Sequence, residues 1–213
     1  MSEFSIAILI SGNGSNLQAI IDAIRKKEIK GKICCVLSNK RGAYGLERAK
    51  KAKISTEIIN NEAFETREKF DSEMVKVLFN YQPNLIILAG FMRILSPVFI
   101  NAFKGRILNI HPSLLPKYPG LNTHERVLQS KDKCHGITIH FVDESLDGGP
   151  ICAQSSLEIN TTSVKELEEK IHKLEHELYP KVVSWYQQGL LKLKDGKVYF
   201  KEKQLYFGEI NDK

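Results

Sequence analysis

The sequence predicts an α/β protein built on a doubly wound, mostly parallel open sheet, with antiparallel strands added in the C-terminal half. In the first half, short and almost wholly apolar segments alternate with segments whose apolar residues recur at helical spacing. This pattern is typical of buried parallel strands joined by helices. The first apolar segment, residues 5–10, runs directly into a glycine-rich turn and a helical pattern. Beyond residue 135, two strand-like segments instead follow one another across a short acidic loop, which predicts an antiparallel pair.

The individual elements follow from apolar patterning and from helix-capping residues. Strands are expected in the first half at residues 5–10, 33–37, 56–59, 84–89 and 107–111. Helices are expected at residues 17–24, 44–51 and 62–81, and from Ser96-Pro97 onward. In the second half we expect strands at 136–142 and 151–159, a long helix capped by Ser163 with Glu166 in the capping-box position, and a hairpin around Asp195-Gly196.

Length and composition indicate a globular protein with one well-packed core. A chain of 213 residues suffices for a single domain with an appended hairpin, and 42% hydrophobic with 26% charged residues is an ordinary composition. No apolar run approaches the ~20 residues of a membrane helix. Residues 1–4 also lack the basic and apolar regions of a signal peptide. We therefore expect a cytoplasmic protein with no membrane partner.

Charge and cysteine usage narrow the choice of partners. The net charge of +6 comes from short lysine and arginine runs that are scattered along the chain without interleaved aromatic residues. Solvated surfaces or anionic small substrates explain such a distribution better than nucleic acid does. The four cysteines show no C-x-x-C or Cys/His metal spacing, so we expect them to be reduced packing residues: Cys34, Cys35, Cys134 and Cys152.

The turn Ser11–Asn16 follows the first strand and opens the first helix. A glycine-rich turn in this position presents backbone N–H groups and the positive end of a helix to an anion. The third glycine of a dinucleotide fingerprint is replaced by Leu17, and the Gly-Lys-Ser/Thr ending of a P-loop is missing. The turn therefore predicts a monophosphate site at Gly14, Ser15 and Asn16; a plain tight turn is the alternative.

The segment Ile107–Gly120 begins as an apolar strand and becomes a proline-rich loop. Asn109 and His111 are two residues apart, so on an extended strand their side chains point to the same face. Pro112 ends the strand because it has no N–H to donate. An amide and an imidazole at the carboxyl end of a strand lie where ligands bind in open α/β sheets. The alternative is a pair of ordinary polar groups at a strand end.

Three further features carry chemical groups, each with an ordinary explanation beside it. Residues 91–95 place apolar side chains just past a strand, either as a binding wall or as packing under a helix. The loop 143–150 carries Asp147 in a glycine-rich context and would otherwise be a solvated hairpin loop. The remaining histidines without metal spacing are better explained as surface or packing residues: His124, His172 and His176.

Four blocks of the sequence, in one order, resemble the folate-dependent phosphoribosylglycinamide formyltransferases. They are residues 10–20, 88–96, 108–116 and 146–150, within a similarity that runs from the first strand to about Trp185. The resemblance implies a Rossmann-like formyltransferase fold in a single domain. It implies a phosphate-binding half over about residues 1–100, a catalytic and folate-binding half over about 101–188, and a C-terminal hairpin over about 189–213.

The resemblance also implies a reaction and its residues. A formyl group would pass from 10-formyltetrahydrofolate, a co-substrate, to the amine of glycinamide ribonucleotide in purine (IMP) biosynthesis, without metal, nicotinamide or flavin. Carried over by position, the catalytic residues are Asn109, His111 and Asp147. Those on the ribonucleotide side are Gly14, Ser15, Asn16, Pro112 and Glu175. Those lining the folate pocket are Arg67, Met92, Arg93, Ile94, Leu95, Asn109, Val142, Asp143, Glu144 and Asp147.

The chemistry of formyl transfer fits these side chains. As an amine attacks the formyl carbonyl, negative charge grows on the oxygen, and the amide of Asn109 and a protonated His111 can stabilise it. An ordinary histidine is mostly neutral at pH 7, so His111 needs an anion beside it, and Asp147 on the loop 143–150 is the expected partner. His111 can then give a proton toward the leaving nitrogen, directly or through a water molecule.

Two alternatives stay open. A methionyl-tRNA formyltransferase would share the Asn-x-His and Asp core and suit the basic charge, but it needs an RNA-binding domain for which too few residues follow Gly189. A non-catalytic nucleotide-binding module on the same sheet is the other, and the intact set of three catalytic residues argues against it. We therefore expect small-molecule substrates, no nucleic acid partner, and a monomer or homodimer.

Overall fold

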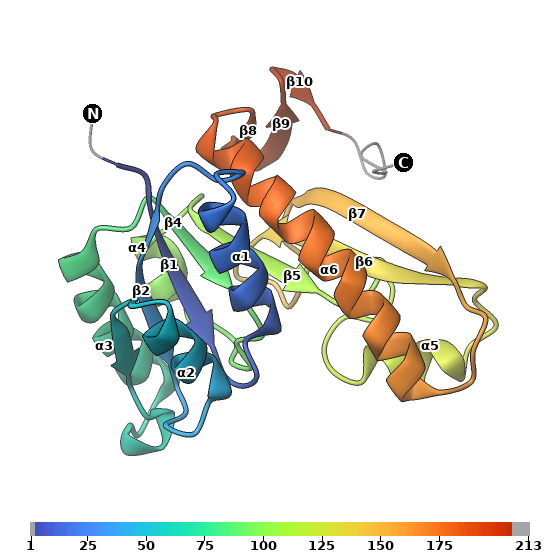
Figure 1. The fold of residues 1–213 in the computed structure, drawn as a ribbon, viewed down its shortest axis with the longest axis horizontal. Coiled ribbons are helices and arrows are strands. Elements are labelled where there is room, and N and C mark those ends of the chain that lie inside the picture. Colours follow the sequence, from blue (N-terminus) through green and yellow to red (C-terminus); the bar gives the residue numbers. More distant parts are fainter. Residues whose placement is uncertain (1–2, 206–213) are drawn as a thin grey trace. The chain divides into compact units, whose positions relative to one another are not determined.

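The computed structural model describes residues 3–205. The chain divides into two compact units, residues 1–109 and residues 110–213. Figure 1 shows the helices and strands of both units.

The first unit is built on parallel strands in a doubly wound order. Its strands are β1 (Ser5–Ile10), β2 (Lys32–Ser38), β3 (Thr56–Ile58), β4 (Leu85–Leu88) and β5 (Ile107–His111), the last of which continues into the second unit. Parallel pairing gives the order β3-β2-β1-β4-β5. All six residues of β1 are buried, as expected for a central strand covered on both faces. The order reverses between β1 and β4, which confirms the predicted doubly wound topology.

Four helices connect these strands: α1 (Ser15–Arg25), α2 (Tyr44–Lys51), α3 (Arg67–Tyr81) and α4 (Pro97–Ala102). Helix α1 packs against α2, and α3 packs against α4. The chain runs from β1 outward to β3 and then returns past β1 to β4 and β5. Right-handed crossovers in these two opposite directions place α1 and α2 on one face of the sheet and α3 and α4 on the other. In Figure 1 the blue helix α1 and the cyan helix α2 lie next to each other, beside β1 and β2.

Helix α3 begins later than the sequence pattern predicts. The predicted start at Glu62 falls in a single 3₁₀ turn, Asn61–Ala63, and Phe64 is extended. The helix starts instead at Arg67, because the Thr66 side chain accepts a hydrogen bond from the Lys69 N–H at 3.2 Å and caps it. The apolar pattern of the sequence places Phe64, Phe70, Met74, Val77 and Leu78 on one stripe. Phe70, Met74 and Leu78 are buried in the helix with Asp71 beside them, whereas Val77 is half-buried and Phe64 precedes the helix.

The second unit holds the antiparallel part of the fold. Strands β6 (Cys134–Phe141) and β7 (Ile151–Glu158) pair antiparallel, which confirms the predicted hairpin. The hydrogen-bonded order of the larger sheet is β3-β2-β1-β4-β5-β6-β7. A short helix, α5 (Thr123–Leu128), precedes β6, and the long helix α6 (Val164–Gln187) packs on β6 and β7.

Helix α6 carries one half of the predicted capping box. The Ser163 side chain accepts a hydrogen bond from the Glu166 N–H at 3.3 Å. The Glu166 carboxylate does not reach back to the Ser163 N–H, because it binds the Thr161 hydroxyl at 2.6 Å and Lys170 Nζ at 2.7 Å instead. The Ser163 N–H donates to the Thr161 hydroxyl at 3.1 Å, so Thr161 rather than Glu166 accepts the hydrogen bond from this N–H.

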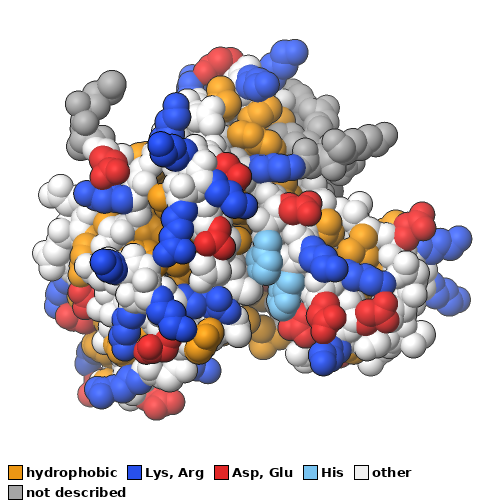
Figure 2. All heavy atoms as spheres, in the orientation of Figure 1, with side chains coloured by type: hydrophobic (Ala, Val, Ile, Leu, Met, Phe, Trp, Pro, Cys, Tyr) orange, Lys and Arg blue, Asp and Glu red, His pale blue; other side chains and the backbone are white. Residues whose placement is uncertain are grey.

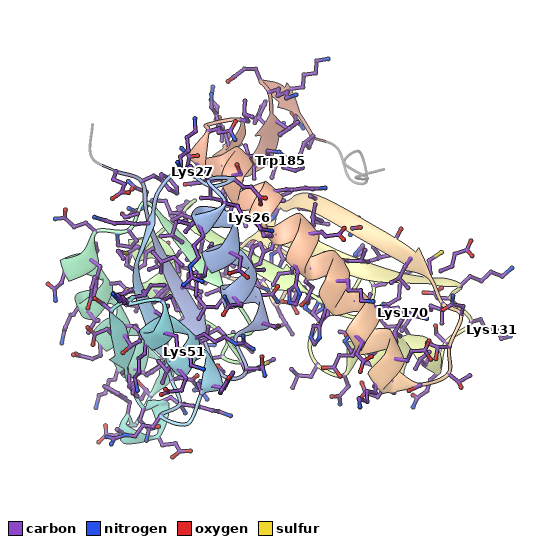
Figure 3. The ribbon with its side chains drawn as sticks, in the orientation of Figure 1. Lys26, Lys27, Lys51, Lys131, Lys170 and Trp185 are labelled. Atoms are coloured by element: carbon purple, nitrogen blue, oxygen red, sulfur yellow. The ribbon has the colours of Figure 1, made fainter. Side chains whose placement is uncertain are left out.

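A small antiparallel sheet follows α6. Strands β8 (Leu191–Lys194) and β9 (Lys197–Phe200) form the predicted hairpin around Asp195-Gly196, and both turn residues have positive φ as a tight two-residue turn requires. A third strand, β10 (Lys203–Gln204), pairs with β9 and was not predicted. Trp185, labelled in Figure 3, packs on Phe200 with ring centroids 4.9 Å apart.

The surface of the described residues carries charges of both signs. Figure 2 shows lysine and arginine side chains interspersed with aspartate and glutamate on the face in view. Within residues 3–205 no helix is long and apolar enough to cross a membrane. The four cysteines are free thiols; Cys35 and Cys152 are buried packing residues as predicted, whereas Cys34 is half-buried and Cys134 is exposed.

Candidate active site

The turn after β1 places the first turn of α1 at the point where the strand order reverses, which is where ligands bind in doubly wound sheets. Gly14 precedes the helix in the left-handed conformation, with φ 73°. It has no side chain to accept from the first-turn N–H groups, and that turn carries no acidic residue. Ser15 and Asn16 are the first two residues of α1, and Asn16 is buried. The predicted phosphate turn thus has the geometry of an anion site.

Ser11 ties this turn to the ends of two other strands. Its hydroxyl donates to Asn39 Oδ1 at 2.6 Å, just past β2, and accepts from the Met92 N–H at 2.8 Å, just past β4. The Ser11 N–H donates to the Gly90 carbonyl at 3.1 Å. One buried serine therefore sets the relative position of the turn after β1 and the loop after β4.

The loop after β4 contains both buried and exposed apolar residues. Phe91 and Leu95 are buried, whereas 65% of Met92 and 56% of Ile94 are exposed. Both alternatives predicted for this loop therefore apply: its two ends, Phe91 and Leu95, are buried packing, and the three residues between them are exposed. Arg93 is exposed on the same loop. Arg67 is the first residue of α3 and forms an exposed ion pair with Glu68 at 3.6 Å.

Asp71 connects α3 to the end of that loop. Its side chain is fully buried, and Oδ2 accepts a hydrogen bond from the Ser96 N–H at 2.5 Å. Burial raises the pKa of this carboxyl, while the bond from Ser96 and the positive charges of Arg67 and Arg93 act in the opposite direction. A carboxylate on α3 thus fixes the residue that begins α4, directly after Met92–Leu95.

His111 closes β5 in the second unit and is 5% exposed. Its Nε2 lies 2.9 Å from the Tyr118 carbonyl oxygen, and its Nδ1 lies 3.4 Å from Asp147 Oδ2. A carbonyl oxygen only accepts, so Nε2 is the donor in the first contact. Nδ1 faces a carboxylate, which a protonated nitrogen satisfies. Both ring nitrogens therefore face acceptors, an arrangement suited to the imidazolium form.

Asp147 is held by its own loop and by the segment after β5. Its backbone is left-handed, with φ 51°, a conformation that aspartate tolerates better than most residues. Asp147 Oδ2 also accepts a hydrogen bond from the Gly120 N–H at 2.8 Å. Gly149 allows the close approach of the loop to β6, because a Cβ there would lie 1.9 Å from the Phe141 carbonyl oxygen.

The turn after Pro112 is anchored to β6 and β7 by a buried polar network. The Thr138 hydroxyl donates to the Ser113 carbonyl at 2.7 Å and accepts from the Leu115 N–H at 3.0 Å. Gln154 Nε2 donates to the Leu115 carbonyl at 2.9 Å. Pro112 itself is half-buried. These bonds fix the backbone that leads from His111 to Tyr118.

Burial favours the neutral form of three other histidines in the second unit: His124, His135 and His140. His140 lies with Nε2 4.0 Å from Asp147 Oδ1, and burial lowers its pKa. His124 Nδ1 and His135 Nε2 are 3.0 Å apart. Burial, together with the neighbouring His124, lowers the pKa of His135 to about 4. The residues described form no group of three or more potential metal ligands.

The structure brings together His111 and Asp147, and Asn109 lies two residues before His111 on the same strand. Glu175 is buried on α6. Val142 is half-buried at the end of β6, and Asp143 and Glu144 are exposed in the loop 143–150. The predicted residues in the first unit are Gly14, Ser15, Asn16, Arg67, Met92, Arg93, Ile94, Leu95 and Asn109.

Three residues that contribute these contacts were not among the residues predicted from the sequence: Asp71, Tyr118 and Gly120. The sequence could have indicated Asp71, because it is the one acidic residue among the buried residues of α3, and a buried charge requires partners. The others contribute through a backbone atom or through contacts between distant segments. Such contacts leave no local pattern in a sequence.

A doubly wound sheet with a glycine-rich turn at the start of its first helix and a buried His–Asp pair is typical of α/β enzymes. The family model described as Formyl transferase matches residues 4–183. The chain is 49% identical over 190 residues to phosphoribosylglycinamide formyltransferase of Escherichia coli (strain K12), covering 89% of this chain and 90% of that protein. The chain belongs to the formyl transferase family.

A second relative and a solved structure are similar to this chain over most of its length. The chain is 46% identical to phosphoribosylglycinamide formyltransferase of Haemophilus influenzae, with 94% of this chain and 95% of that protein covered. The solved phosphoribosylglycinamide formyltransferase of Coxiella burnetii has a TM-score of 0.91 and 46% identity, with 96% and 97% coverage. The predicted Rossmann-like formyltransferase fold is confirmed by this likeness.

Proposed function

We propose that this enzyme transfers the formyl group of 10-formyltetrahydrofolate to the amine of N1-(5-phospho-β-D-ribosyl)glycinamide, giving the N-formyl ribonucleotide and tetrahydrofolate in purine biosynthesis. Membership of the formyl transferase family and the similarity to two phosphoribosylglycinamide formyltransferases support the reaction type and the acceptor. The observation that carries the proposal is the contact of His111 Nδ1 with Asp147 Oδ2 at 3.4 Å in a buried position. It supplies a charged hydrogen-bond donor without a metal ion.

The proposed chemistry uses three side chains. The amine nitrogen attacks the formyl carbon, and the oxyanion that forms is stabilised by the Asn109 amide and by protonated His111. The bond from the formyl carbon to N10 of the folate then breaks. The proton lost by the amine is delivered to N10, with His111 or a water molecule held by Asp147 as the carrier. Asp147 keeps the imidazolium ring oriented throughout.

The two substrates are assigned to the remaining predicted residues. The substrate phosphate binds the N–H groups of Gly14, Ser15 and Asn16, where the helix end favours an anion. Pro112 and Glu175 contact the ribonucleotide. The folate contacts the exposed apolar residues of the loop after β4 and polar groups beside them. The residues in this second set are Arg67, Met92, Arg93, Ile94, Leu95, Asn109, Val142, Asp143, Glu144 and Asp147.

The broader setting is also part of the proposal. The chain acts as a single formyltransferase domain, because the family match runs without a break across both compact units. It works in the cytoplasm as a monomer or homodimer, on small molecules rather than on nucleic acid. It needs no metal, nicotinamide or flavin, because the formyl donor carries the reacting group.

The test is a direct assay. Purified protein is incubated with 10-formyltetrahydrofolate and glycinamide ribonucleotide, and release of tetrahydrofolate and formation of the formylated product are followed. We expect stoichiometric release with this acceptor and none with methionyl-tRNA. A folded protein that releases no tetrahydrofolate with glycinamide ribonucleotide would contradict the proposal, and transfer to methionyl-tRNA would favour the alternative acceptor.

A further inference from the structure

Arg48 on α2 contacts the turn that precedes α1. Its Nε donates to the Asn13 carbonyl at 2.9 Å, and its Nη2 donates to Asn13 Oδ1 at 3.0 Å. Its Nη1 reaches Gln18 Oε1, one turn into α1, at 3.4 Å. The guanidinium carbon lies 5.0 Å from the centre of the Tyr44 ring. One side chain therefore holds both the residue before Gly14 and the helix after it.

The backbones of α2 and of this turn also meet directly. The Gly45 N–H donates to the Gly12 carbonyl at 3.0 Å. A Cβ on Gly14 would lie 2.7 Å from the Gly45 Cα, so the two glycines approach too closely for any side chain on Gly14. The first turn of α2 is thus a support for residues 12–14. The Arg48 fork then sets the orientation of Asn13 against that support.

From these contacts we infer that Arg48 is a positioning residue for the substrate phosphate, acting through Asn13 and the turn Gly12–Gly14. The inference rests on the proposed phosphate site and assigns to it a residue outside the turn. The guanidinium holds two acceptors of Asn13 in one plane, which fixes the direction in which the N–H groups after Asn13 point. A lysine in its place would keep the charge but lose the planar fork.

A charge effect without positioning makes a different prediction. If only the charge of Arg48 mattered, Arg48→Lys would keep it and the phosphate would bind as before. Loss of another cation on α2 would also weaken binding, by an amount that depends on its distance from the phosphate. Lys51 provides the matched control, because it is the last residue of the same helix and is exposed (Figure 3). Positioning predicts a loss for Arg48 variants that the Lys51 variant does not share.

The experiment compares two acceptors in each protein: glycinamide ribonucleotide and the same nucleoside without its phosphate. The measured quantity is the ratio of kcat/KM for the two acceptors. This ratio is insensitive to a lower fraction of folded protein, because both values come from one preparation. The proteins are the wild type and the variants Arg48→Met, Arg48→Lys, Lys51→Met and Asn16→Ala.

We expect Arg48→Met to lower the ratio by about tenfold, because bonds that involve a charged donor are among the stronger ones. Arg48→Lys should lower it by about threefold or more, and Lys51→Met should leave it within about twofold of the wild type. An unchanged ratio in Arg48→Lys would overturn positioning in favour of charge alone, as would an equal loss in Lys51→Met.

The Asn16→Ala arm separates this inference from the proposed phosphate site. If Asn16→Ala lowers the ratio and Arg48→Met does not, the phosphate site stands and the role of Arg48 is rejected. If neither variant lowers the ratio, or if the wild type does not prefer the phosphorylated acceptor, the phosphate site itself is wrong.

Discussion

Asp147 Oδ2 accepts a hydrogen bond from the Gly120 N–H at 2.8 Å. The same oxygen lies 3.4 Å from His111 Nδ1, and the Tyr118 carbonyl lies 2.9 Å from His111 Nε2. The backbone of residues 118–120 therefore contacts both members of the His–Asp pair. The Gly120 N–H donates to the carboxylate and the Tyr118 carbonyl accepts from the imidazole, so this backbone positions both side chains.

Replacement of Asp147 by asparagine tests the charge on this pair. The variant Asp147→Asn keeps the shape of the side chain but offers no negative charge to His111, so the imidazolium is no longer favoured. We expect kcat to fall on the order of 10²-fold or more, from lost stabilisation of the oxyanion. Steady-state kinetics with both substrates measure it. Near-wild-type turnover would remove Asp147 from the mechanism, and His111→Ala should show a loss of similar size.

Asp132 holds the segment that contacts His111. Its Oδ2 accepts from the Tyr118 hydroxyl at 2.8 Å, and its carboxylate binds Lys117 Nζ at 2.8 and 2.9 Å. Both partners lower the pKa of Asp132. Asp132→Ala should therefore loosen the Tyr118 carbonyl and lower kcat by about threefold to tenfold with little change in the stability of the fold.

The control for the Asp132 prediction is Tyr118→Phe. It removes only the hydroxyl and leaves the Lys117–Asp132 pair in place. A loss of kcat in Asp132→Ala together with a smaller loss in Tyr118→Phe agrees with a shared clamp on the backbone. Unchanged kcat in both variants would show that the side-chain contacts of Asp132 do not reach the active site.

Asp71 should be important for stability through its bond to Ser96. Asp71→Ala leaves the buried Ser96 N–H without this acceptor, and we expect a loss of about 1–3 kcal/mol in the free energy of unfolding. Asp71→Asn keeps an acceptor and should lose much less. Urea denaturation of the two variants measures the difference. Equal losses would show that the charge, rather than the bond to Ser96, is what matters.

The raised pKa of Asp71 also predicts how the stability of Asp71→Asn, relative to the wild type, changes with pH. Burial disfavours the charged carboxylate, so the stability that Asp71 contributes is present at low pH and is lost as the pH rises through its pKa in the folded protein. Asp71→Asn lacks this titration. Its stability relative to the wild type should therefore improve as the pH is raised from the acidic range to neutrality.

Much of the fold could be predicted because its signals are local. The apolar run at residues 5–10 predicts a buried strand, and the glycine-rich turn after it predicts the start of a helix. The structure shows both where the pattern places them. The hairpin around Asp195-Gly196 is a signal of the same kind. The start of α3 was predicted too early, because Phe64 continues the apolar stripe although Thr66 is the cap.

The site was only partly predictable, for a physical reason. His111 and Asp147 are 36 positions apart, and their pairing was inferred from the charge requirement of the chemistry and from family resemblance. The role of Gly120 depends on its backbone N–H, which every residue except proline possesses. Arg48 and Asn13 meet across 35 positions, a contact that depends on the packing of α2 and α1. Tertiary contacts of this kind are decided by the fold as a whole.

The buried histidine pair predicts how stability depends on pH. Burial and the neighbouring His124 lower the pKa of His135 to about 4, below its ordinary value of 6.5. The folded state therefore favours neutral His135, and this contribution is complete above about pH 6.5 and is lost as the pH falls toward about 4. His135→Gln removes the titration. Its free energy of unfolding should fall less than that of the wild type between pH 7 and pH 4.5.

The matched control for His135 is His172→Gln, because the His172 side chain is 41% exposed on α6 and its removal eliminates the same type of group. Urea denaturation at several pH values should show the wild-type slope in this control and a smaller slope in His135→Gln, with about one proton fewer taken up on unfolding. Equal slopes in the two variants would mean that His135 is protonated in the folded protein. Its 3.0 Å contact with His124 would then persist only while His124 stays neutral and accepts, because two charged rings offer each other only donors.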